Sequence, residues 1–247
     1  MSDTRIERTE IKNPEEFEMH IEFLQPWSTF VMKTKLPPPI LEKMIKISDK
    51  IIEDKDPAIR FGHSLAGQIE DEFFIEPNIL KREGVISFFL EMCQHFIITA
   101  YIQRGEQEEK MRPKTDWSPI LTSAWVVSQK DNEYNPTHNH KGVVSGVMYL
   151  KIPEYLPDRK SPEKRSKVSH DGAILFSNNT SQCGIWAIPE FLQQPQVGDI
   201  FLFPSTQRHQ VFPFRTPDGK GERRSVSFNA DLDKPSAEYT NHPHDDS

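Results

Sequence analysis

The stretch SGVMYLKI, residues 145–152, sets the pattern that decides the fold, because it is a short apolar run of strand length followed by polar residues. Other runs share its length and composition: ILTSAWVVSQ (120–129), GAILFSN (172–178), DIFLFP (199–204), HQVFPF (209–214) and RRSVSFNADL (223–232). Pro, Gly, Asn or Asp residues separate these runs, as is typical of turns. Many short strands at modest spacing predict a β-sandwich, a jelly roll or a cupin-like barrel.

Upstream of these strands the chain has helical character. Apolar residues recur at helical spacing after the prolines at 37–39, which suit a helix start: Leu41, Met44, Ile45, Ile51 and Ile52. A second amphipathic helix is predicted from Asn78 to about Arg104, with Gly105 as its stop. The sequence therefore predicts a mainly β protein with supporting helices, in the α+β class.

One domain over residues 1–247 is expected, because this length suits a single sizeable core. Its parts are predicted as an N-terminal helical scaffold with a first strand (1–111), a β core (112–234) and a disordered tail (235–247). The helical part is a candidate for substrate specificity or for a homodimer surface, and nothing in it selects between the two. The long connection from Pro153 to Asp171 is either a solvated insertion or a lid over the substrate.

Composition excludes several classes of protein. The formal net charge of −7 gives no attraction to anionic membranes and argues against nucleic acid as a partner. The 2 cysteines, Cys93 and Cys183, lie far apart, so we expect inert thiols rather than a disulfide framework or a thiolate metal site. The N-terminus is polar and acidic, and no run approaches the length of a membrane span. A cytoplasmic protein is expected.

Three histidines form the candidate metal site. His138 and His140 stand just before the apolar run at 143–150, where alternation would place side chains two positions apart on one face of a strand. His209 opens a later strand and is the natural third ligand. Neutral imidazoles suit Fe(II), Zn(II) and Cu(II). An H-x-H pair by itself is a weak signal, and two surface histidines are the alternative interpretation.

Arg223 is the second element of the candidate site. An arginine inside a barrel needs an anionic partner, because burying an unpaired guanidinium is costly. Arg223 and Ser225 share a strand face, so together they could hold one end of a dicarboxylate. Arg224 is expected to face the other way, either in solvent or paired with Glu222.

Three segments carry a resemblance to a known family: HNHKGVVSGVMYL (138–150), VGDIFLFPSTQRHQVFPF (197–214) and GERRSVSFNADL (221–232). They resemble the Fe(II)- and 2-oxoglutarate-dependent oxygenases of the double-stranded β-helix superfamily, in particular a group common in marine phages and bacteria. The resemblance spans Trp125 to Asp231. It implies a double-stranded β-helix (jelly-roll or cupin-like) core.

The resemblance also implies roles for individual residues. Iron would be held by the H-x-H pair and by His209, and would be chelated by 2-oxoglutarate. Arg223 and Ser225 would hold the far carboxylate of 2-oxoglutarate, and Tyr149 would contribute a hydroxyl. The implied reaction uses dioxygen to hydroxylate a small molecule or a protein side chain such as proline, and it releases succinate and CO2.

The sequence departs from the usual H-x-D or H-x-E pattern, because His140 stands at the carboxylate position. Either His138, His140 and His209 form a three-histidine site, or His140 is the first ligand and Gly142 occupies the carboxylate position, as in halogenating members of the superfamily. In the second case His138 would not be a metal ligand, and it would support the ligands or contact the substrate instead. Asp131 or Glu133 could also reach inward as a substitute carboxylate, although a solvated turn is the simpler role for both.

Two other functions fit the same residues. A cupin-like three-histidine dioxygenase would not use 2-oxoglutarate, and Arg223 would hold a substrate carboxylate. A non-catalytic module would only bind a metal or a carboxylate. Four further residues have predicted roles near the site or in the core. Trp125 is expected in the pocket wall or the core, His95 in the core, and His63 and His170 as candidate substrate contacts.

Overall fold

Two antiparallel sheets form the centre of the molecule. The computed structural model describes residues 30–62, 65–105, 118–156, 170–178 and 190–233. The strands are β1 (Met32–Lys35), β2 (Asp71–Phe74), β3 (Pro119–Lys130), β4 (Asn135–His138), β5 (Val144–Lys151), β6 (Ile174–Ser177), β7 (Glu190–Gln193), β8 (Asp199–Pro204), β9 (His209–Val211) and β10 (Glu222–Leu232). The helices are α1 (Pro38–Asp54), α2 (Pro77–Arg82) and α3 (Ile86–Gly105), and a 3-10 turn covers Pro57–Ile59.

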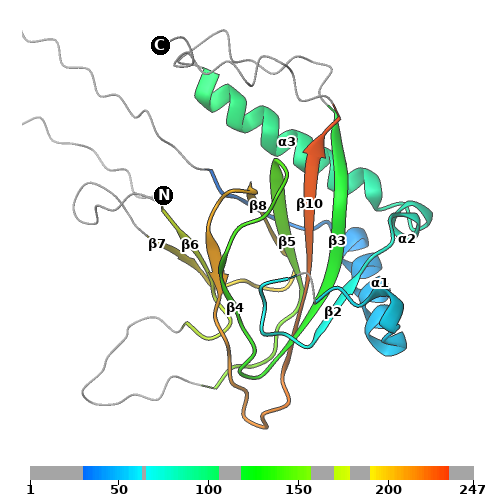
Figure 1. Ribbon diagram of the computed structural model, residues 1–247, viewed down its shortest axis with the longest axis vertical. Helices are drawn as coiled ribbons and strands as arrows, with labels where there is room; N and C mark the ends of the chain where they lie inside the picture. Colours follow the sequence, from blue (N-terminus) through cyan, green and yellow to red (C-terminus); the bar gives the residue numbers. More distant parts are fainter. Residues whose placement is uncertain (1–29, 63–64, 106–117, 157–169, 179–189, 234–247) are drawn as a thin grey trace, which may run out of the picture.

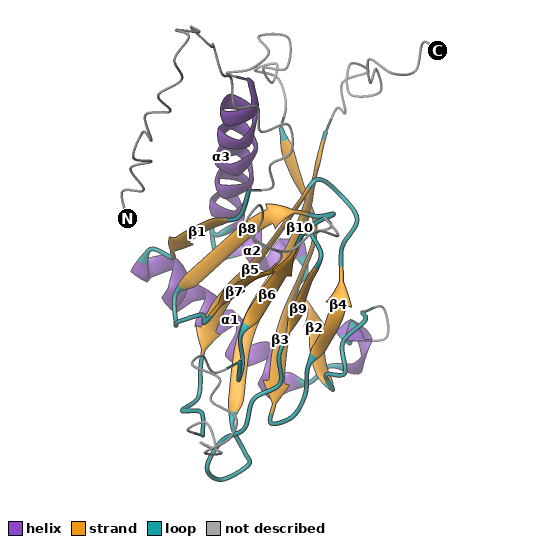
Figure 2. Cartoon of the chain, turned by 90° about the vertical axis from the view of Figure 1, so that its left-hand side faces the viewer, coloured by secondary structure: helices purple, strands orange, loops and turns teal. Residues whose placement is uncertain are grey.

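The strand order is that of a double-stranded β-helix. The larger sheet has the order β1-β8-β5-β10-β3-β2 and the smaller sheet the order β4-β9-β6-β7. From β3 to β10 the chain passes repeatedly between the two sheets, and Figure 1 shows the smaller sheet to the left of the larger one. Figure 2 shows the strands of both sheets nearly aligned. The predicted fold class is confirmed.

All six apolar runs of the sequence form strands, namely β3, β5, β6, β8, β9 and β10. The strands at 135–138 and 190–193 were not predicted, because their sequences, NPTH and EFLQ, lack a clear apolar alternation. Strands β1 and β2 come from the N-terminal part and extend the larger sheet by pairing with β8 and β3. The helical scaffold therefore shares a sheet with the β core.

The helix predictions are partly correct. The first helix forms as α1 and buries Met44, Ile47 and Ile51. The expected continuous helix from Asn78 to Arg104 is wrong, because α2 ends at Arg82 and α3 begins at Ile86. Gly84 lies between them with φ of +67°, a left-handed conformation that glycine adopts readily and that ends a helix.

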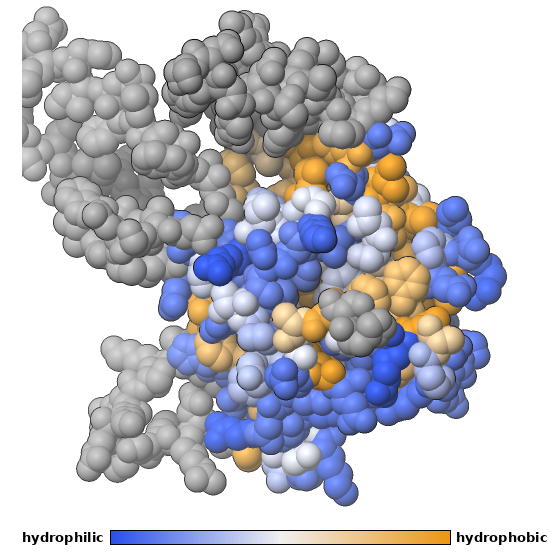
Figure 3. Space-filling view, in the orientation of Figure 1, coloured by the Kyte–Doolittle hydropathy of each residue, from blue (hydrophilic) through white to orange (hydrophobic). Residues whose placement is uncertain are grey.

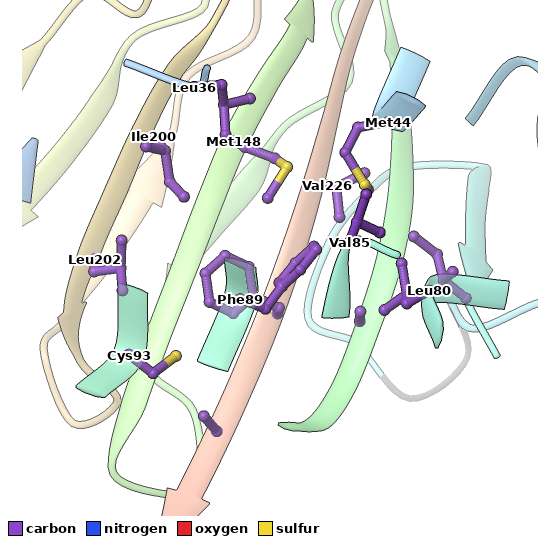
Figure 4. Packing of buried hydrophobic residues seen from close by; sticks show 14 of the residues in the cluster. Leu36, Met44, Leu80, Val85, Phe89, Cys93, Met148, Ile200, Leu202 and Val226 are labelled. Atoms are coloured by element: carbon purple, nitrogen blue, oxygen red, sulfur yellow. The ribbon is translucent and has the colours of Figure 1, made fainter. Parts of the chain in front are cut away.

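The main hydrophobic core lies between the helices and the outer face of the larger sheet. Figure 4 shows Phe89 of α3 close to Met148 and Val226, which point outward from β5 and β10. The rings of Phe89 and Phe228 meet edge to face, with centroids 4.9 Å apart. A Cβ on Gly146 would lie 2.2 Å from the Phe228 ring, so glycine is required there for this packing. Since alternate residues point to opposite faces, the inner face of these strands is left to line the space between the sheets.

Other expectations concern single residues and segments. His95 is exposed on α3, so its predicted place in the core is wrong. Cys93 is a buried free thiol, and burial raises its pKa to about 12, as expected for an inert cysteine. The boundary near residue 112, the connection at 157–169, Cys183, His63 and the tail after 234 lie outside the described residues.

The described surface is mostly hydrophilic on the face in Figure 3, and apolar side chains gather toward its upper right. Ile98 on α3 and Ile120 on β3 are among the exposed large apolar residues of the described chain. Within the described ranges, no helix combines the length and the apolar character needed to cross a membrane.

Candidate metal centre and its cavity

The pairing of β4 with β9 brings two of the histidines together. His138 ends β4 and stands directly opposite His209, the first residue of β9, with ring centroids 4.3 Å apart. His140 follows in the loop before β5, and its ring centroid lies 5.0 Å from that of His138 and 5.2 Å from that of His209. The nitrogen atoms that the three residues can offer to an ion all lie within 4.8 Å of one another.

The predicted reason for this convergence is wrong. His138 and His140 do not share the strand that contains Val144 to Lys151, because His138 belongs to the smaller sheet and His140 to a loop. What assembles the cluster is the register between β4 and β9 together with the turn of the chain after β4. The three residues nevertheless meet as expected.

Backbone carbonyls orient the imidazoles. Nδ1 of His138 donates to the carbonyl of Pro136 (2.7 Å), and Nδ1 of His209 donates to the carbonyl of Gln207 (2.9 Å). A carbonyl oxygen can only accept, so both rings carry their proton on Nδ1 and keep Nε2 free. Hydrogen bonds of this kind fix the tautomer and the ring orientation of metal-binding histidines.

Ser205 holds the loop that carries His140. Its carbonyl accepts from the backbone N–H of His140 (2.8 Å), its own N–H donates to the carbonyl of Val143 (3.1 Å), and its hydroxyl donates to the carbonyl of Gly142. Gly142 has φ of +95°, and a Cβ there would lie 2.8 Å from the carbonyl oxygen of Ala230. The glycine is thus required by the loop's own geometry.

The protonation state suits metal binding. Burial lowers the pKa of His138, although the hydrogen bond to Pro136 opposes this shift. Burial and the nearby His138 lower the pKa of His140 to about 4, and burial lowers that of His209 to about 3. All three imidazoles are therefore neutral near pH 7, which is the form that binds a metal ion.

A cavity of about 210 Å³ connects the histidines to Arg223. The predicted site residues all line it: His138, His140, His209, Tyr149, Arg223 and Ser225, and also Trp125. Ser225 of β10 lies directly opposite Tyr149 of β5, and Arg223 is on the same face of β10. The structure thus brings together every residue that the sequence assigned to metal or cofactor binding.

Two buried donor groups in this cavity have no partner among the residues that the structure describes. Arg223 is 2% exposed and donates from Nη1 to the carbonyl of Gly172 (2.7 Å), but its Nε has no partner among the described residues. The Tyr149 hydroxyl is also without a partner there, and burial raises its pKa to about 12 although Arg223 opposes the shift. A guanidinium with an unpaired Nε and a neutral phenol, both buried, fit a carboxylate ligand. With the imidazole cluster, they fit a metal ion and a dicarboxylate.

The alternative carboxylates are occupied elsewhere. Glu133 accepts from the backbone N–H groups of Lys130 (2.7 Å) and Glu70 (3.1 Å). Asp131 accepts from the backbone N–H and the hydroxyl of Thr216. Neither lines the cavity, so their role in turns is the one that the structure supports.

Arg224 points away from the cavity, as predicted. It pairs with Glu222 (2.6 Å) and contacts Asp49 of α1. It is 7% exposed, so it is paired rather than solvated.

Trp125 combines its two proposed roles, since it is buried and its ring lies 5.9 Å from that of His140. His170 is exposed and packs near Phe212 instead of lining the cavity.

Sequence reasoning missed Glu72. This residue of β2 is 1% exposed and lines the cavity, and its Oε2 has no hydrogen-bond partner in the described part of the chain. Burial, and secondarily Glu133, raises its pKa to about 7. The strand sequence DEFF (71–74) has no polar–apolar alternation, and the sequence does not show that this short strand joins the sheet beside β3.

Comparison with known proteins agrees with this geometry. A family model described as "Putative 2OG-Fe(II) oxygenase" matches residues 123–229. No curated protein matches the chain.

Similar solved structures include a 2OG-Fe(II) oxygenase family oxidoreductase from Burkholderia pseudomallei, with 14% identity and a TM-score of 0.31 over 46% of this chain and 44% of that one. The chain thus spans less than half of that protein. A Pseudomonas putida prolyl-4-hydroxylase has 14% identity and a TM-score of 0.45, covering 81% of this chain and 91% of that one. A Trichoplax adhaerens prolyl hydroxylase, solved with a hypoxia inducible factor peptide fragment, has 11% identity and a TM-score of 0.47, covering 82% of both chains.

The family match ends within β10 and spans all three histidines, Tyr149, Arg223 and Ser225. Residues 123–229 of this chain therefore resemble a 2OG-Fe(II) oxygenase domain, and this segment carries the histidines, Tyr149, Arg223 and Ser225.

Proposed function

We propose that the protein is a non-haem Fe(II), 2-oxoglutarate-dependent dioxygenase that hydroxylates a small molecule or a protein side chain such as proline, with release of succinate and CO2. The observation that carries this proposal is the buried Arg223, whose Nε has no partner in the described part of the chain and which lines the same cavity as the histidine cluster. Hydroxylation is the outcome that the family most often produces.

The ligands proposed for iron are His138, His140 and His209. Their nitrogen atoms lie within 4.8 Å of one another, which supports the three-histidine arrangement over the one in which Gly142 leaves a ligand position open. Bound Fe(II) would supply the redox chemistry that activates dioxygen. The hydrogen bonds of His138 and His209 leave Nε2 of both rings without a proton, and Trp125, Phe203 and Val211 give the cavity apolar walls.

The residues proposed for 2-oxoglutarate are Arg223, Tyr149 and Ser225. The Arg223 guanidinium and the Tyr149 hydroxyl would donate to the far carboxylate, which would satisfy both buried donors. Ser225 lies opposite Tyr149 and adds a hydroxyl on the same side of the cavity. These contacts would orient the cosubstrate with its other end toward the histidines.

The test is anaerobic addition of Fe(II) and 2-oxoglutarate, followed by absorbance for the weak visible charge-transfer band of the chelate. We expect the band in the wild-type protein, and succinate when oxygen is admitted. Arg223→Ala should weaken 2-oxoglutarate binding while iron binding persists. Arg208→Ala is the matched control, because Arg208 is exposed beside His209. Absence of the band in folded, iron-loaded protein would refute the proposal, and loss of iron binding in Arg223→Ala would refute the role of Arg223.

A second candidate is favoured by His140, which stands where the family pattern has a carboxylate. A cupin-like three-histidine dioxygenase would oxidise its substrate directly, with Arg223 holding a substrate carboxylate. Such an enzyme would bind Fe(II) without forming the 2-oxoglutarate band. The same anaerobic titration therefore separates the two functions.

A further inference from the structure

Glu72 occupies the side of the cavity opposite the proposed 2-oxoglutarate residues. Register places it in one row across the larger sheet, since Glu72 pairs with Val127, Val127 with Ser225, and Ser225 with Tyr149. Paired residues point to the same side of a sheet, so Glu72 faces the cavity as the others do. Three strand spacings separate it from Tyr149, or about 14 Å. The row thus has a carboxylate at one end, from Glu72, and a phenol hydroxyl at the other, from Tyr149.

Acceptor oxygens gather at the Glu72 end. A Cβ on Gly67 would lie 2.1 Å from Oδ1 of Asn135 and 3.6 Å from Oε2 of Glu72, and a Cβ on Gly62 would lie 3.3 Å from the same Oε2. Asn135 comes from β4 and also lines the cavity. A carboxylate and an amide oxygen therefore approach each other from the two sheets, with glycines leaving space beside them.

The neighbouring residue shows how unusual Glu72 is. Asp71 points to the other side of β2, where Lys55 lies 2.8 Å and Arg60 3.7 Å from its carboxylate. Glu72 is at least as buried, yet its Oε2 has no partner in the described part of the chain. Burying a carboxylate without a partner is costly, so such a group is typical of a binding site whose ligand completes it.

We propose that Glu72, with Asn135, binds a cationic nitrogen of the substrate, an ammonium or a guanidinium group. This inference rests on the proposed oxygenase function and names the class of its substrate. Oε2 of Glu72 would accept a charge-assisted hydrogen bond, and the amide oxygen of Asn135 would accept a second. The cation would neutralise a carboxylate whose pKa burial otherwise raises to about 7.

The rest of the cavity is consistent with a substrate held in this way. Trp125 and Val127 lie on β3, between β2 and β10, and offer apolar surface to a carbon chain. The Trp125 ring lies 5.9 Å from that of His140, so this surface leads toward the histidine cluster. A substrate anchored at Glu72 would thus extend toward the proposed iron site, away from the residues proposed for 2-oxoglutarate.

The experiment compares small probes that differ in charge. Ligand-observed NMR titrations would use protein loaded with Zn(II) and 2-oxoglutarate, with butylammonium, butylguanidinium, 1-butanol and butyrate as probes. We expect the cations to bind about tenfold more tightly than the alcohol or the acid, as a charged hydrogen bond provides. Glu72→Gln should abolish this preference and leave the affinity for 1-butanol unchanged.

Controls keep the result interpretable. Glu70→Gln changes an exposed glutamate of the same segment and should keep the cation preference. Glu72→Asp retains the charge and should keep part of the preference, which covers the case in which Glu72→Gln does not fold. Equal binding of all probes, or a cation preference that persists in Glu72→Gln, would overturn the proposal. A loss of iron affinity in Glu72→Gln with unchanged probe selectivity would also overturn it, because Glu72 would then act on the metal.

The two proposals fail separately. Absence of the anaerobic 2-oxoglutarate band removes the oxygenase function, whatever the probes do. A normal band together with no charge preference removes only the role of Glu72.

Discussion

Replacing Glu72 by glutamine should stabilise the metal-free protein, and increasingly so as the pH rises. Glu72 is 1% exposed, and burial raises its pKa from 4.5 to about 7. The folded state therefore binds this proton more tightly than the unfolded state. The stability that Glu72 contributes is greatest below about pH 4.5 and is lost as the pH rises toward 7.

The size of the effect follows from the two pKa values. At roughly 1.4 kcal/mol for each tenfold difference in proton affinity, an ionised Glu72 lowers the free energy of unfolding by about 3 kcal/mol above pH 7. Between pH 5 and pH 8 the advantage of the Glu72→Gln variant should grow by about 2.5 kcal/mol. The neutral amide has no corresponding titration, so the pH dependence isolates the carboxylate from any constant cost of the substitution.

The assay is urea unfolding of both proteins at several pH values from 5 to 8, with a chelator present. Metal must be removed, because a bound cation in the cavity would favour the ionised carboxylate. Glu70→Gln serves as the control for an exposed glutamate in the same segment. If the difference between wild type and Glu72→Gln is the same at pH 5 and pH 8, the carboxylate is not held in an unfavourable environment and the argument fails.

Three further predictions concern the loop, the core and the acid response. Ser205→Ala should weaken iron binding by about tenfold, because it removes the hydroxyl's hydrogen bond to Gly142 in the loop that carries His140. Thr206→Ala, at an exposed neighbour, should leave iron binding unchanged. Equal metal titrations of the two variants would contradict this. Gly146→Ala should cost about 1–3 kcal/mol in urea unfolding, because its Cβ would lie 2.2 Å from the Phe228 ring, and an unchanged midpoint would exclude that clash. Burial would raise the pKa of Glu222, but hydrogen bonds from Lys, Ser and Arg side chains lower it to about 2. The stability that the Glu222 carboxylate contributes is therefore present above about pH 4.5 and is lost as the pH falls to about 2. Acid unfolding followed by circular dichroism should show this loss of stability in the wild type and not in Glu222→Gln.

The β core was predictable because burial leaves a strong imprint on the sequence. The strands β5 and β8 are buried on both faces or nearly so, and such strands appear as continuous apolar runs. Arg223 was identified instead from the strand face that it shares with Ser225. The site residues of the core could therefore be identified before their geometry was known.

The parts that were missed depend on contacts distant in sequence. The strand that ends at His138 has little apolar character and exists through its pairing with β9, so the sequence placed the histidine on the wrong strand. Glu72 was missed because β2 reaches the cavity only by pairing with β3. The break between α2 and α3 was indicated by Gly84, but the apolar periodicity on both sides outweighed it.

The contact between Phe228 and Gly146 has a consequence for precision on the other side of the sheet. Sliding β10 by one residue would turn Phe228 inward and would bring Arg224 into the cavity in place of Arg223. Because Arg223 and Arg224 carry the same charge, either alignment would place a guanidinium in the cavity. The Phe228 ring packs against Gly146, which has no side chain, and this contact forms in only one alignment of β10 with β5. The position of the guanidinium in the cavity is thus set by the packing of Phe228 against Gly146 on the opposite face of the sheet.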